Sequence, residues 1–285
     1  MAEILDGKLV AGAINERLKA AVEQLKTKGV TPTLAIVRVG ARGDDVSYEK
    51  GAVKRCETVG VVVKKFTLAA DATQQELLAV IGEINKDNSI HGCLLFRPLP
   101  KQMNDEAVRN ALAPEKDIDG ITDASLVGVF TGTTVGYPPC TAQACMEILD
   151  YYGIDPKGKR AVVVGRSLVV GKPAAMMLLG RHATVTICHT RTADMPAECR
   201  RGEILIVSAG RAKIVGKDYL SPGQVVIDVG INVTEDGKLC GDVDFEAAQS
   251  IVGAITPVPG GVGTVTTSVL VKHVVQAAKK SAGMM

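Results

Sequence analysis

The sequence is poor in aromatic residues and contains no long apolar segment. Aromatic residues make up 3% of the 285 positions and tryptophan is absent, although apolar residues reach 46%. Cores built with few aromatics depend on Val, Ile, Leu and Ala, the residues that fill parallel sheets buried on both faces. The apolar runs are much shorter than a membrane span requires, so we expect a protein that does not enter the membrane.

An excess of charge of one sign is also lacking. The 33 basic and 31 acidic residues are spread along the chain and leave a net charge of +2. This distribution provides no extended basic surface for nucleic acid or for an anionic membrane. We therefore expect a small-molecule partner.

Paired cysteine motifs and targeting signals are missing too. The seven cysteines are scattered without CxxC spacing, and the first ten residues, MAEILDGKLV, include no basic and apolar signal segment. Reduced thiols and a cytoplasmic location are therefore expected. No His, Cys and Asp residues have the spacing of metal ligands, so we predict no metal site.

The patterns that are present predict an α/β protein. At 285 residues the chain reaches the length at which single cores stop growing, which favours two domains. Short apolar runs alternate with helical patterns, which indicates βαβ units and parallel sheets. The predicted strands are 33–40, 61–68, 92–96, 161–165, 183–188, 203–209, 224–230 and 251–256. The predicted helices are 8–28, 44–59, 73–85, 141–152 and 265–280.

The segment 161–173, AVVVGRSLVVGKP, carries the strongest local signal for a ligand. A buried strand runs into Gly165, and Gly171 follows at the start of a helix. Glycine lets a backbone pass close to a pyrophosphate, and a helix N-terminus offers free N–H donors. We predict a dinucleotide site that includes Gly165, Arg166, Ser167 and Gly171. The spacing departs from G-x-G-x-x-G, so a plain strand-to-helix turn remains the alternative.

The residues after the next predicted strand distinguish NADP from NAD. An NAD site carries a carboxylate there, which binds the ribose 2′-hydroxyl. Here ATVTIC (183–188) is followed by Thr190 and Arg191 without an acid, and Arg166 adds a second cation. Guanidinium groups form charge-assisted, often bidentate bonds to phosphate, so NADP is favoured. The alternative is that both arginines are simply solvated.

Several short segments, spread along the whole chain, match one protein family in order. They are SY (47–48), KRCE (54–57), PLP (98–100), KDIDG (116–120), PCT (139–141), VGRS (164–167), DVGIN (228–232), GDV (241–243) and TPVPGGVG (256–263). Together they resemble the methylenetetrahydrofolate dehydrogenase/cyclohydrolases of the bifunctional FolD type.

The resemblance implies two α/β lobes with the folate bound in a cleft between them. Residues 1–139, completed by the C-terminal helix 265–285, would form the folate-binding catalytic lobe. Residues 140–264 would form a Rossmann-type, parallel-sheet domain for NADP, and the protein would be a homodimer. The cofactor site would also include three residues further along the chain: Ala209, Gly210 and Ile231.

The resemblance also implies roles for particular side chains. Tyr48 would stack along the pterin or aminobenzoate region of the folate. Asp119 would bond the amino-pyrimidine edge of the pterin, since a carboxylate can accept from two donors. Pro259, Gly260 and Gly261 would line the substrate site near the nicotinamide. A turn-forming Asp and a Tyr on a helix surface are the alternatives for the first two.

At two catalytic positions the sequence departs from this family. The family has a catalytic Lys four residues after the Tyr, on the same helix face, where this chain has Ala52. The family's Gln in VQLPLP is replaced by Phe96. The flanking matches fix the register, and Lys50 and Lys54 point to other sides of the helix. A smaller departure is Thr264, which replaces a Pro and is expected to be the N-cap of the last helix.

The two reactions of the family differ in their need for these groups. Oxidation of 5,10-methylenetetrahydrofolate passes a hydride to NADP, and the folate's own nitrogens stabilise the product, so positioning suffices. Hydrolysis of the methenyl cation needs proton transfer, where a placed acid–base group contributes about 10²- to 10⁴-fold. We therefore predict an NADP-dependent dehydrogenase with weak or absent cyclohydrolase activity, with Tyr48 and Asp119 in its catalytic site.

Three other interpretations remain open at this point. The enzyme could be fully bifunctional if Arg55, seven residues after Tyr48, replaces the missing Lys. The chain could be a non-catalytic relative that binds folate and NADP. A hydroxy-acid or amino-acid dehydrogenase would need a His or Lys beside a carbonyl, and the four histidines form no recognisable acid–base pair.

Overall fold

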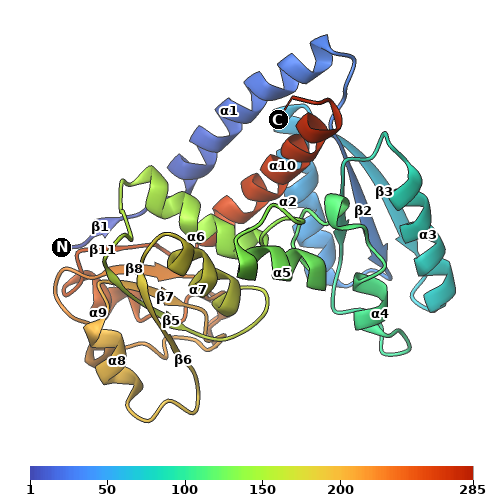
Figure 1. Ribbon diagram of the computed structural model, residues 1–285. Coiled ribbons are helices and arrows are strands. Elements are labelled where there is room, and N and C mark those ends of the chain that lie inside the picture. Colours follow the sequence, from blue (N-terminus) through green and yellow to red (C-terminus); the bar gives the residue numbers. More distant parts are fainter. Residues whose placement is uncertain (285) are drawn as a thin grey trace. The chain divides into compact units, whose positions relative to one another are not determined.

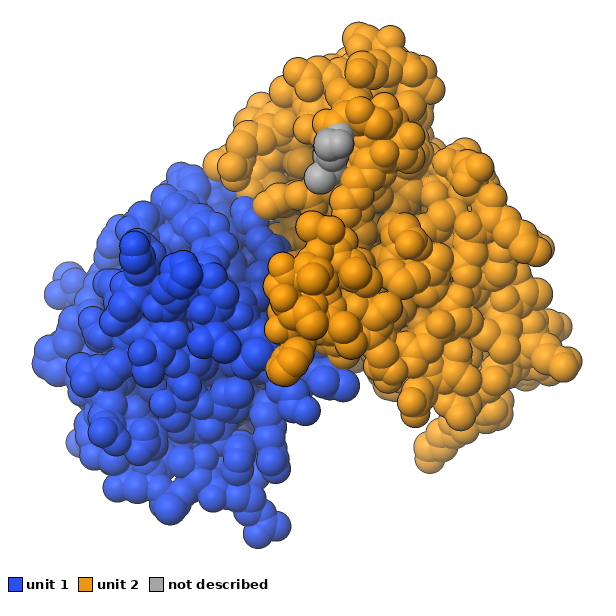
Figure 2. Space-filling view, in the orientation of Figure 1, with its two compact units in different colours: residues 1–12, 141–266 blue, residues 13–140, 267–285 orange. Residues whose placement is uncertain are grey.

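The structure, a computed structural model, describes residues 1–284. The chain forms two compact units, one of residues 1–12 and 141–266 and the other of residues 13–140 and 267–285. Figure 2 shows them in blue and orange, as unit 1 and unit 2. Each unit contains a parallel sheet with helices, so the predicted α/β class is confirmed (Figure 1). In the described chain no helix is both long and apolar enough to cross a membrane.

Unit 1 is built on a six-stranded parallel sheet. Its strand order is β1-β11-β8-β7-β5-β6. The strands are β1 (Glu3–Ile4), β5 (Arg160–Val164), β6 (Thr184–Cys188), β7 (Ile204–Val207), β8 (Val225–Asp228) and β11 (Ala254–Ile255). The unit also contains α6 (Cys140–Tyr151, from its second residue), α7 (Gly171–Gly180), α8 (Met195–Arg201), the 3-10 helix η2 (Lys217–Tyr219), α9 (Phe245–Gln249) and the hairpin β9 (Asn232–Val233) with β10 (Leu239–Cys240).

The central strands of unit 1 are runs of aliphatic residues, many of them β-branched, as buried parallel strands require. β7 is buried throughout, and β5 is buried after its first residue. β5 lies between β6 and β7, so consecutive strands leave it toward opposite sides of the sheet. This reversal of strand order is the switch point at which doubly wound sheets bind their ligands, outside the carboxyl ends of the strands.

Unit 2 has a smaller parallel sheet of three strands in the order β3-β2-β4. The strands are β2 (Thr33–Val39), β3 (Val62–Leu68) and β4 (Gly92–Leu95). The helices are α1 (Gly7–Thr27, from Ala13 onward), α2 (Gly43–Val59), α3 (Gln74–Lys86), α4 (Asp105–Arg109), the 3-10 helix η1 (Pro114–Lys116), α5 (Asp123–Thr131) and α10 (Val262–Ser281, from Thr267 onward). The central strand β2 is buried at six of its seven residues, and residues of β2, β4 and α3 form one apolar cluster.

Local sequence explains where the helices of unit 2 begin and end. α2 stops at Gly60, whose left-handed backbone (φ 88°) lets its N–H bond the carbonyl groups of Cys56 and Glu57. α3 starts at a capping box in which Thr73 and Glu76 each bond the other's backbone N–H. Gly60 thus fixes the end of α2, the helix that carries Tyr48.

The units differ from the predicted domains at the N-terminus. We expected residues 1–139 in the first lobe, but Met1–Gly12 belongs to unit 1. The reason is that β1 extends the large sheet by pairing in parallel with β11. Two residues of strand are too short to stand out in the sequence.

The start of the last helix was also predicted wrongly. α10 begins at Val262 rather than at residue 265, and Thr264 is therefore inside the first turn instead of being the N-cap. The Thr264 N–H bonds the carbonyl of Gly261 at 3.1 Å, as expected of a residue in a first turn.

Candidate active site and cofactor site

Helix α2 carries the first part of the predicted substrate site in unit 2. Tyr48 is 36% exposed, whereas Ala52, one turn later, is fully buried. Phe96, which directly follows β4, meets the Tyr48 ring edge-on with 6.0 Å between the ring centroids. The structure thus brings together Tyr48 and the residue at the family's Gln position. Their contact is apolar.

Asp119 is held by a tightly bonded loop after η1. The neighbouring Asp117 is fully buried and accepts hydrogen bonds from the Ile121 and Thr122 N–H groups at 2.9 and 2.8 Å. It also accepts one from the Ser125 hydroxyl at 2.6 Å. Asp117 therefore anchors the loop that carries Asp119.

The electrostatics around Asp119 favour a protonated or hydrogen-bonded carboxyl group. Burial and the charge of the nearby Asp117 together raise the pKa of Asp119 to about 7, although hydrogen bonds from Cys140 and the charge of Arg97 act in the opposite direction. Arg97 is itself bonded to Asp105, with Nε 2.7 Å from Oδ1. The protonated form of the Asp119 carboxyl group is therefore accessible near neutral pH.

The hydroxyl of Tyr48 is unsuited to lose its proton. Although Tyr48 as a whole is partly exposed, burial of its hydroxyl end raises the pKa well above the usual value, and the charges of Asp119 and Cys140 raise it further. The Cys140 thiol is held protonated in the same way, mainly by burial, and it donates to the Ile118 carbonyl at 3.2 Å. Tyr48 and Cys140 can donate hydrogen bonds here, but neither is a base.

Cations on α2 occupy the positions expected from the helical repeat. Lys50 and Lys54 are exposed. Arg55 is half buried, and burial lowers its pKa. No carboxylate in the described chain forms an ion pair with Arg55.

The cofactor site predicted from the sequence lies in unit 1, at the carboxyl ends of β5, β6 and β7. After β5 the chain turns at Gly165, and α7 begins at Gly171. A Cβ at Gly171 would come within 2.2 Å of the Gly165 carbonyl oxygen, so this turn accepts only glycine there. The Ser167 hydroxyl accepts from the Val170 N–H at 3.1 Å and closes the turn. The turn delivers the free N–H groups of a helix N-terminus to the switch point.

The two arginines that favour NADP follow neighbouring strands of the sheet in unit 1. β5 and β6 pair in register up to Val164 and Cys188, so Arg166 and Arg191 follow adjacent strand ends. Both are exposed, as is Thr190, and no carboxylate among the described residues forms an ion pair with either arginine. Unpaired guanidinium groups at this edge fit a 2′-phosphate.

Two buried carboxylates, whose contacts are not evident from local sequence, order the remaining loops of the predicted cofactor site. Asp242 accepts from the N–H groups of Gly210 and Arg211, at 2.8 and 2.9 Å, and from the side-chain amide of Asn232 at 2.9 Å. Asp242 thereby links the loop after β7, which contains Ala209, to the hairpin that follows Ile231. The segment GDV was noted for its resemblance, but nothing local revealed these long-range bonds.

Asp228, at the end of β8, stabilises the same loops through backbone hydrogen bonds. It accepts from the backbone N–H groups of Gly230, Asp242 and Val243 at 2.9 to 3.0 Å. Burial, together with the charge of Asp242, nonetheless raises the pKa of Asp228 to about 6. The loops around the predicted cofactor residues are therefore tied together by two acidic side chains.

The glycine-rich segment before α10 is shaped by its own backbone. A Cβ at Gly261 would come within 2.4 Å of the Pro257 carbonyl oxygen. The Gly260 carbonyl accepts from the Gly7 N–H at 2.9 Å, which ties the segment to the N-terminus of the chain. Glycine at 261 is thus required by chain packing, whatever Pro259 and Gly260 contact.

Metal ligands do not gather in the part of the chain that the structure describes. Within residues 1–284, no group of three His, Cys, Asp or Glu side chains is arranged to hold a metal ion.

Comparisons with known proteins identify a family over nearly the whole chain. Residues 5–119 match the model of the tetrahydrofolate dehydrogenase/cyclohydrolase catalytic domain, and residues 139–282 match that of the tetrahydrofolate dehydrogenase/cyclohydrolase NAD(P)-binding domain. The "Bifunctional protein FolD" of Carboxydothermus hydrogenoformans is 54% identical, with 100% of both chains covered.

Solved structures agree with this result. The bifunctional FolD enzyme of Campylobacter jejuni is 39% identical and superimposes with a TM-score of 0.96, covering 98% of this chain and 99% of its own. The dehydrogenase-cyclohydrolase of Trypanosoma brucei, solved with NADP and an inhibitor, is 33% identical with a TM-score of 0.92 and 98% coverage of both chains. The family resemblance is confirmed, and the match to an NAD(P)-binding domain agrees with the nicotinamide cofactor predicted from the sequence.

Proposed function

Since this chain belongs to the tetrahydrofolate dehydrogenase/cyclohydrolase family, we propose that it oxidises 5,10-methylenetetrahydrofolate to 5,10-methenyltetrahydrofolate with NADP. We propose further that it hydrolyses the methenyl product weakly or not at all. The observation that carries the second part is Ala52, a fully buried methyl group at the position of the family's catalytic Lys.

The dehydrogenase reaction needs little from the protein besides positioning. NADP supplies the hydride acceptor when it is bound. Tyr48 presents an exposed ring face along which the folate can stack, and Asp119 presents carboxylate oxygens to the amino-pyrimidine edge of the pterin. Two N–H donors from such an edge favour the ionised form of Asp119, so substrate binding is expected to lower a pKa that burial holds near 7.

Hydrolysis of the methenyl cation needs an acid–base group, which Tyr48 and its neighbours do not provide. Water must add to the cation and a proton must reach the leaving nitrogen, which calls for an acid–base group within hydrogen-bond reach. Ala52 has no proton to exchange, Phe96 cannot orient water, and the raised pKa of Tyr48 keeps its hydroxyl protonated. We infer that the methenyl product leaves without efficient hydrolysis.

Unit 1 supplies the preference for NADP over NAD in this proposal. Arg166 and Arg191 follow neighbouring strands and have no carboxylate partner among residues 1–284, so both are available for a 2′-phosphate. In this proposal, unit 2 is the folate-binding lobe and unit 1 is the cofactor domain. A homodimer and a cytoplasmic location remain predictions; sedimentation of the purified protein would test the first.

Two assays on the same purified protein test the proposal. Reduction of NADP in the presence of 5,10-methylenetetrahydrofolate should be readily measured, while the decay of methenyltetrahydrofolate absorbance should stay near the uncatalysed rate. Methenyl hydrolysis as fast as NADP reduction would refute the loss of the cyclohydrolase. Absence of NADP reduction would instead favour a non-catalytic binding protein.

Full bifunctionality is the second candidate, and the half-buried, unpaired Arg55 favours it. An Arg55→Gln variant separates the two possibilities. If Arg55 replaces the missing Lys, the variant should lose hydrolysis and keep NADP reduction; Lys54→Gln, on an exposed side of α2, is the matched control.

A further inference from the structure

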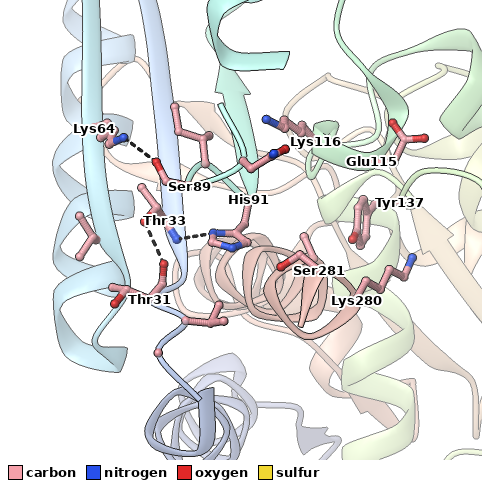
Figure 3. A pocket seen from close by; sticks show the side chains of 16 residues that line it. Thr31, Thr33, Lys64, Ser89, His91, Glu115, Lys116, Tyr137, Lys280 and Ser281 are labelled. Atoms are coloured by element: carbon pink, nitrogen blue, oxygen red, sulfur yellow. Dashed lines mark hydrogen bonds between the residues drawn. The ribbon is translucent and has the colours of Figure 1, made fainter. Parts of the chain in front are cut away.

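A cavity of about 900 Å³ opens in unit 2 at the amino ends of the three strands (Figure 3). Thr33 and Val62 are the first residues of β2 and β3, and His91 directly precedes β4. Phe96 and its contact with Tyr48 follow the carboxyl end of β4. Because the strands are parallel, the cavity and the contact between Phe96 and Tyr48 lie at opposite ends of the strands of unit 2. The cavity is therefore a separate candidate site.

A buried hydroxyl group in the wall of this cavity has no partner. Tyr137 is only 5% exposed, and its hydroxyl forms no hydrogen bond within the described residues. Burial raises its pKa to about 12, helped by the charge of Glu115, so the group is a neutral phenol that can donate. A buried unsatisfied hydroxyl is costly, and a ligand that accepts from it removes that cost.

His91 provides a second donor in the same wall. Its Nδ1 accepts from the Thr33 N–H at 3.2 Å, which places the proton of the neutral ring on Nε2. Burial lowers the pKa of His91, and the nearby Lys116 lowers it further, so the neutral form prevails at pH 7. No hydrogen bond of Nε2 appears within residues 1–284. Figure 3 shows His91 and Tyr137 on walls of the same space, with Ser281 between them.

Positive charge exceeds negative charge along the lining. Three lysines and one carboxylate, Glu115, line the cavity. Lys64 is paired with Asp87, whereas Lys116 bonds the backbone carbonyls of Ile84 and Asp87. Lys280 lies over the Tyr137 ring, 4.9 Å from its centroid, and pairs with no carboxylate of the described chain.

We propose that this cavity is a binding site for a small organic anion, whose phosphate or carboxylate oxygens accept from Tyr137, His91 and Lys280. The remainder of the lining includes apolar side chains at Val30, Ile90 and Ala277, which suit an apolar portion of the same molecule. The volume is in the range of pockets for small organic ligands, about 300–1,000 Å³. The proposal does not depend on the folate chemistry proposed for Tyr48 and Asp119.

Three probes that each contain a phenyl ring test the sign of the ligand's charge and the chemistry of its head group. Phenyl phosphate, benzoate and phenyltrimethylammonium are titrated calorimetrically into the full-length protein saturated with NADP, so that the cofactor's phosphate sites are filled. Phenyl phosphate or benzoate should bind, and the stronger of the two identifies the preferred head group. Binding of neither below about 10 mM, or preferential binding of the cation, overturns the proposal.

Variants assign the binding to this cavity. Lys280→Met should weaken binding of the anion by at least about tenfold, as expected for a hydrogen bond to a charged group. Lys279→Met, its neighbour on α10 outside the lining, makes the same charge change and should leave affinity unchanged. Equal losses of affinity in both variants would mean that binding depends only on the overall charge of the protein, which refutes the site.

Tyr137→Phe separates binding from folding. In the free protein the substitution removes an unsatisfied buried hydroxyl, so the melting temperature should stay the same or rise. Affinity for the anion should nevertheless fall about 2- to 12-fold, the value of one neutral hydrogen bond. Unchanged affinity, with the protein still folded, would show that Tyr137 does not face the ligand.

Discussion

Restoring a lysine at position 52 is the most direct perturbation of the proposed catalytic difference. Ala52 is fully buried on α2, one turn after Tyr48. A lysine at this position carries its ammonium on a four-carbon stem along the helix face shared with Tyr48. The electrostatic neighbours of the Tyr48 hydroxyl are Asp119 and Cys140. The introduced charge should therefore act on Asp119.

Coulomb's law gives the size of that effect for an assumed ion-pair separation. An ammonium group about 5 Å from a carboxylate interacts by roughly 3 kcal/mol at an effective dielectric constant of about 20. This energy corresponds to a fall of about 2 in the pKa of Asp119, which is about 7 in the present protein. Fitting the longer side chain into a packed position should cost about 1–3 kcal/mol of stability.

The assay for Ala52→Lys is the decay of methenyltetrahydrofolate absorbance, run beside NADP reduction. We expect hydrolysis to rise by about 10²- to 10⁴-fold, the usual contribution of a placed acid–base group, while NADP reduction changes little. Adding Phe96→Gln should increase hydrolysis further, because an amide can orient water. The acidic limb of the pH–rate profile should also move to lower pH as the pKa of Asp119 falls.

Ala52→Met is the matched control, since it adds comparable bulk without charge. It should lose similar stability and gain no hydrolysis. The reasoning fails if Ala52→Lys folds, retains NADP reduction and shifts the acidic limb, yet hydrolyses no faster than Ala52→Met. That combination would mean that the lost cyclohydrolase activity depends on something other than this side chain.

Three other predictions concern the cofactor site and the buried acids. Arg191→Ala should raise the KM for NADP by about 10-fold or more and leave that for NAD nearly unchanged, whereas an equal rise for both cofactors would contradict the 2′-phosphate contact. The pKa of Asp119 is higher in the folded than in the unfolded protein, so its contribution to stability is present below about pH 4 and is lost as the pH rises through 7. Asp119→Asn should therefore unfold at higher urea concentrations than the parent above pH 8. If the stability curves of the variant and the parent do not cross between pH 4 and 8, the raised pKa is contradicted. Asp242→Asn removes one acceptor oxygen of a fully buried carboxylate that bonds the N–H groups of Gly210 and Arg211, so stability should fall by about 1–3 kcal/mol, as for a hydrogen bond to a charged group, and calorimetry should show weaker NADP binding. Unchanged binding would mean that these loops hold their shape without the carboxylate.

Local patterns predicted the strands and the cofactor turn because their physical causes are local. A run such as 161–164 is apolar enough to be buried on both faces, and the close approach of Gly165 and Gly171 lies within one turn of chain. The missed features depend on contacts between distant residues. The β1–β11 pair joins residues about 250 positions apart in two-residue strands, and Asp242 meets Gly210 across 32 residues.

The candidate site divides in the same way. Tyr48, Ala52 and Phe96 could be proposed because neighbouring segments fix their register. The state of the Asp119 carboxyl group could not be read from the sequence, since it follows from burial and from Asp117 and Cys140 around it. Tyr137 belongs to the turn-rich stretch before residue 140, where no periodicity distinguishes a buried side chain from a solvated one.

The interleaving of the two units has a consequence for how the protein is made. Unit 2 receives its last helix from residues 267–281, of which Val269, Leu270 and Val274 are fully buried, while unit 1 needs β1 from the opposite terminus. Neither unit is a continuous stretch of polypeptide, so a nascent chain cannot finish its first unit before its second has been synthesised. The most amino-terminal strand, β1, can pair only after β11 has been synthesised. Likewise, α1 to α5 can complete their core only after α10 has been synthesised. Completion of both cores therefore falls near the end of translation.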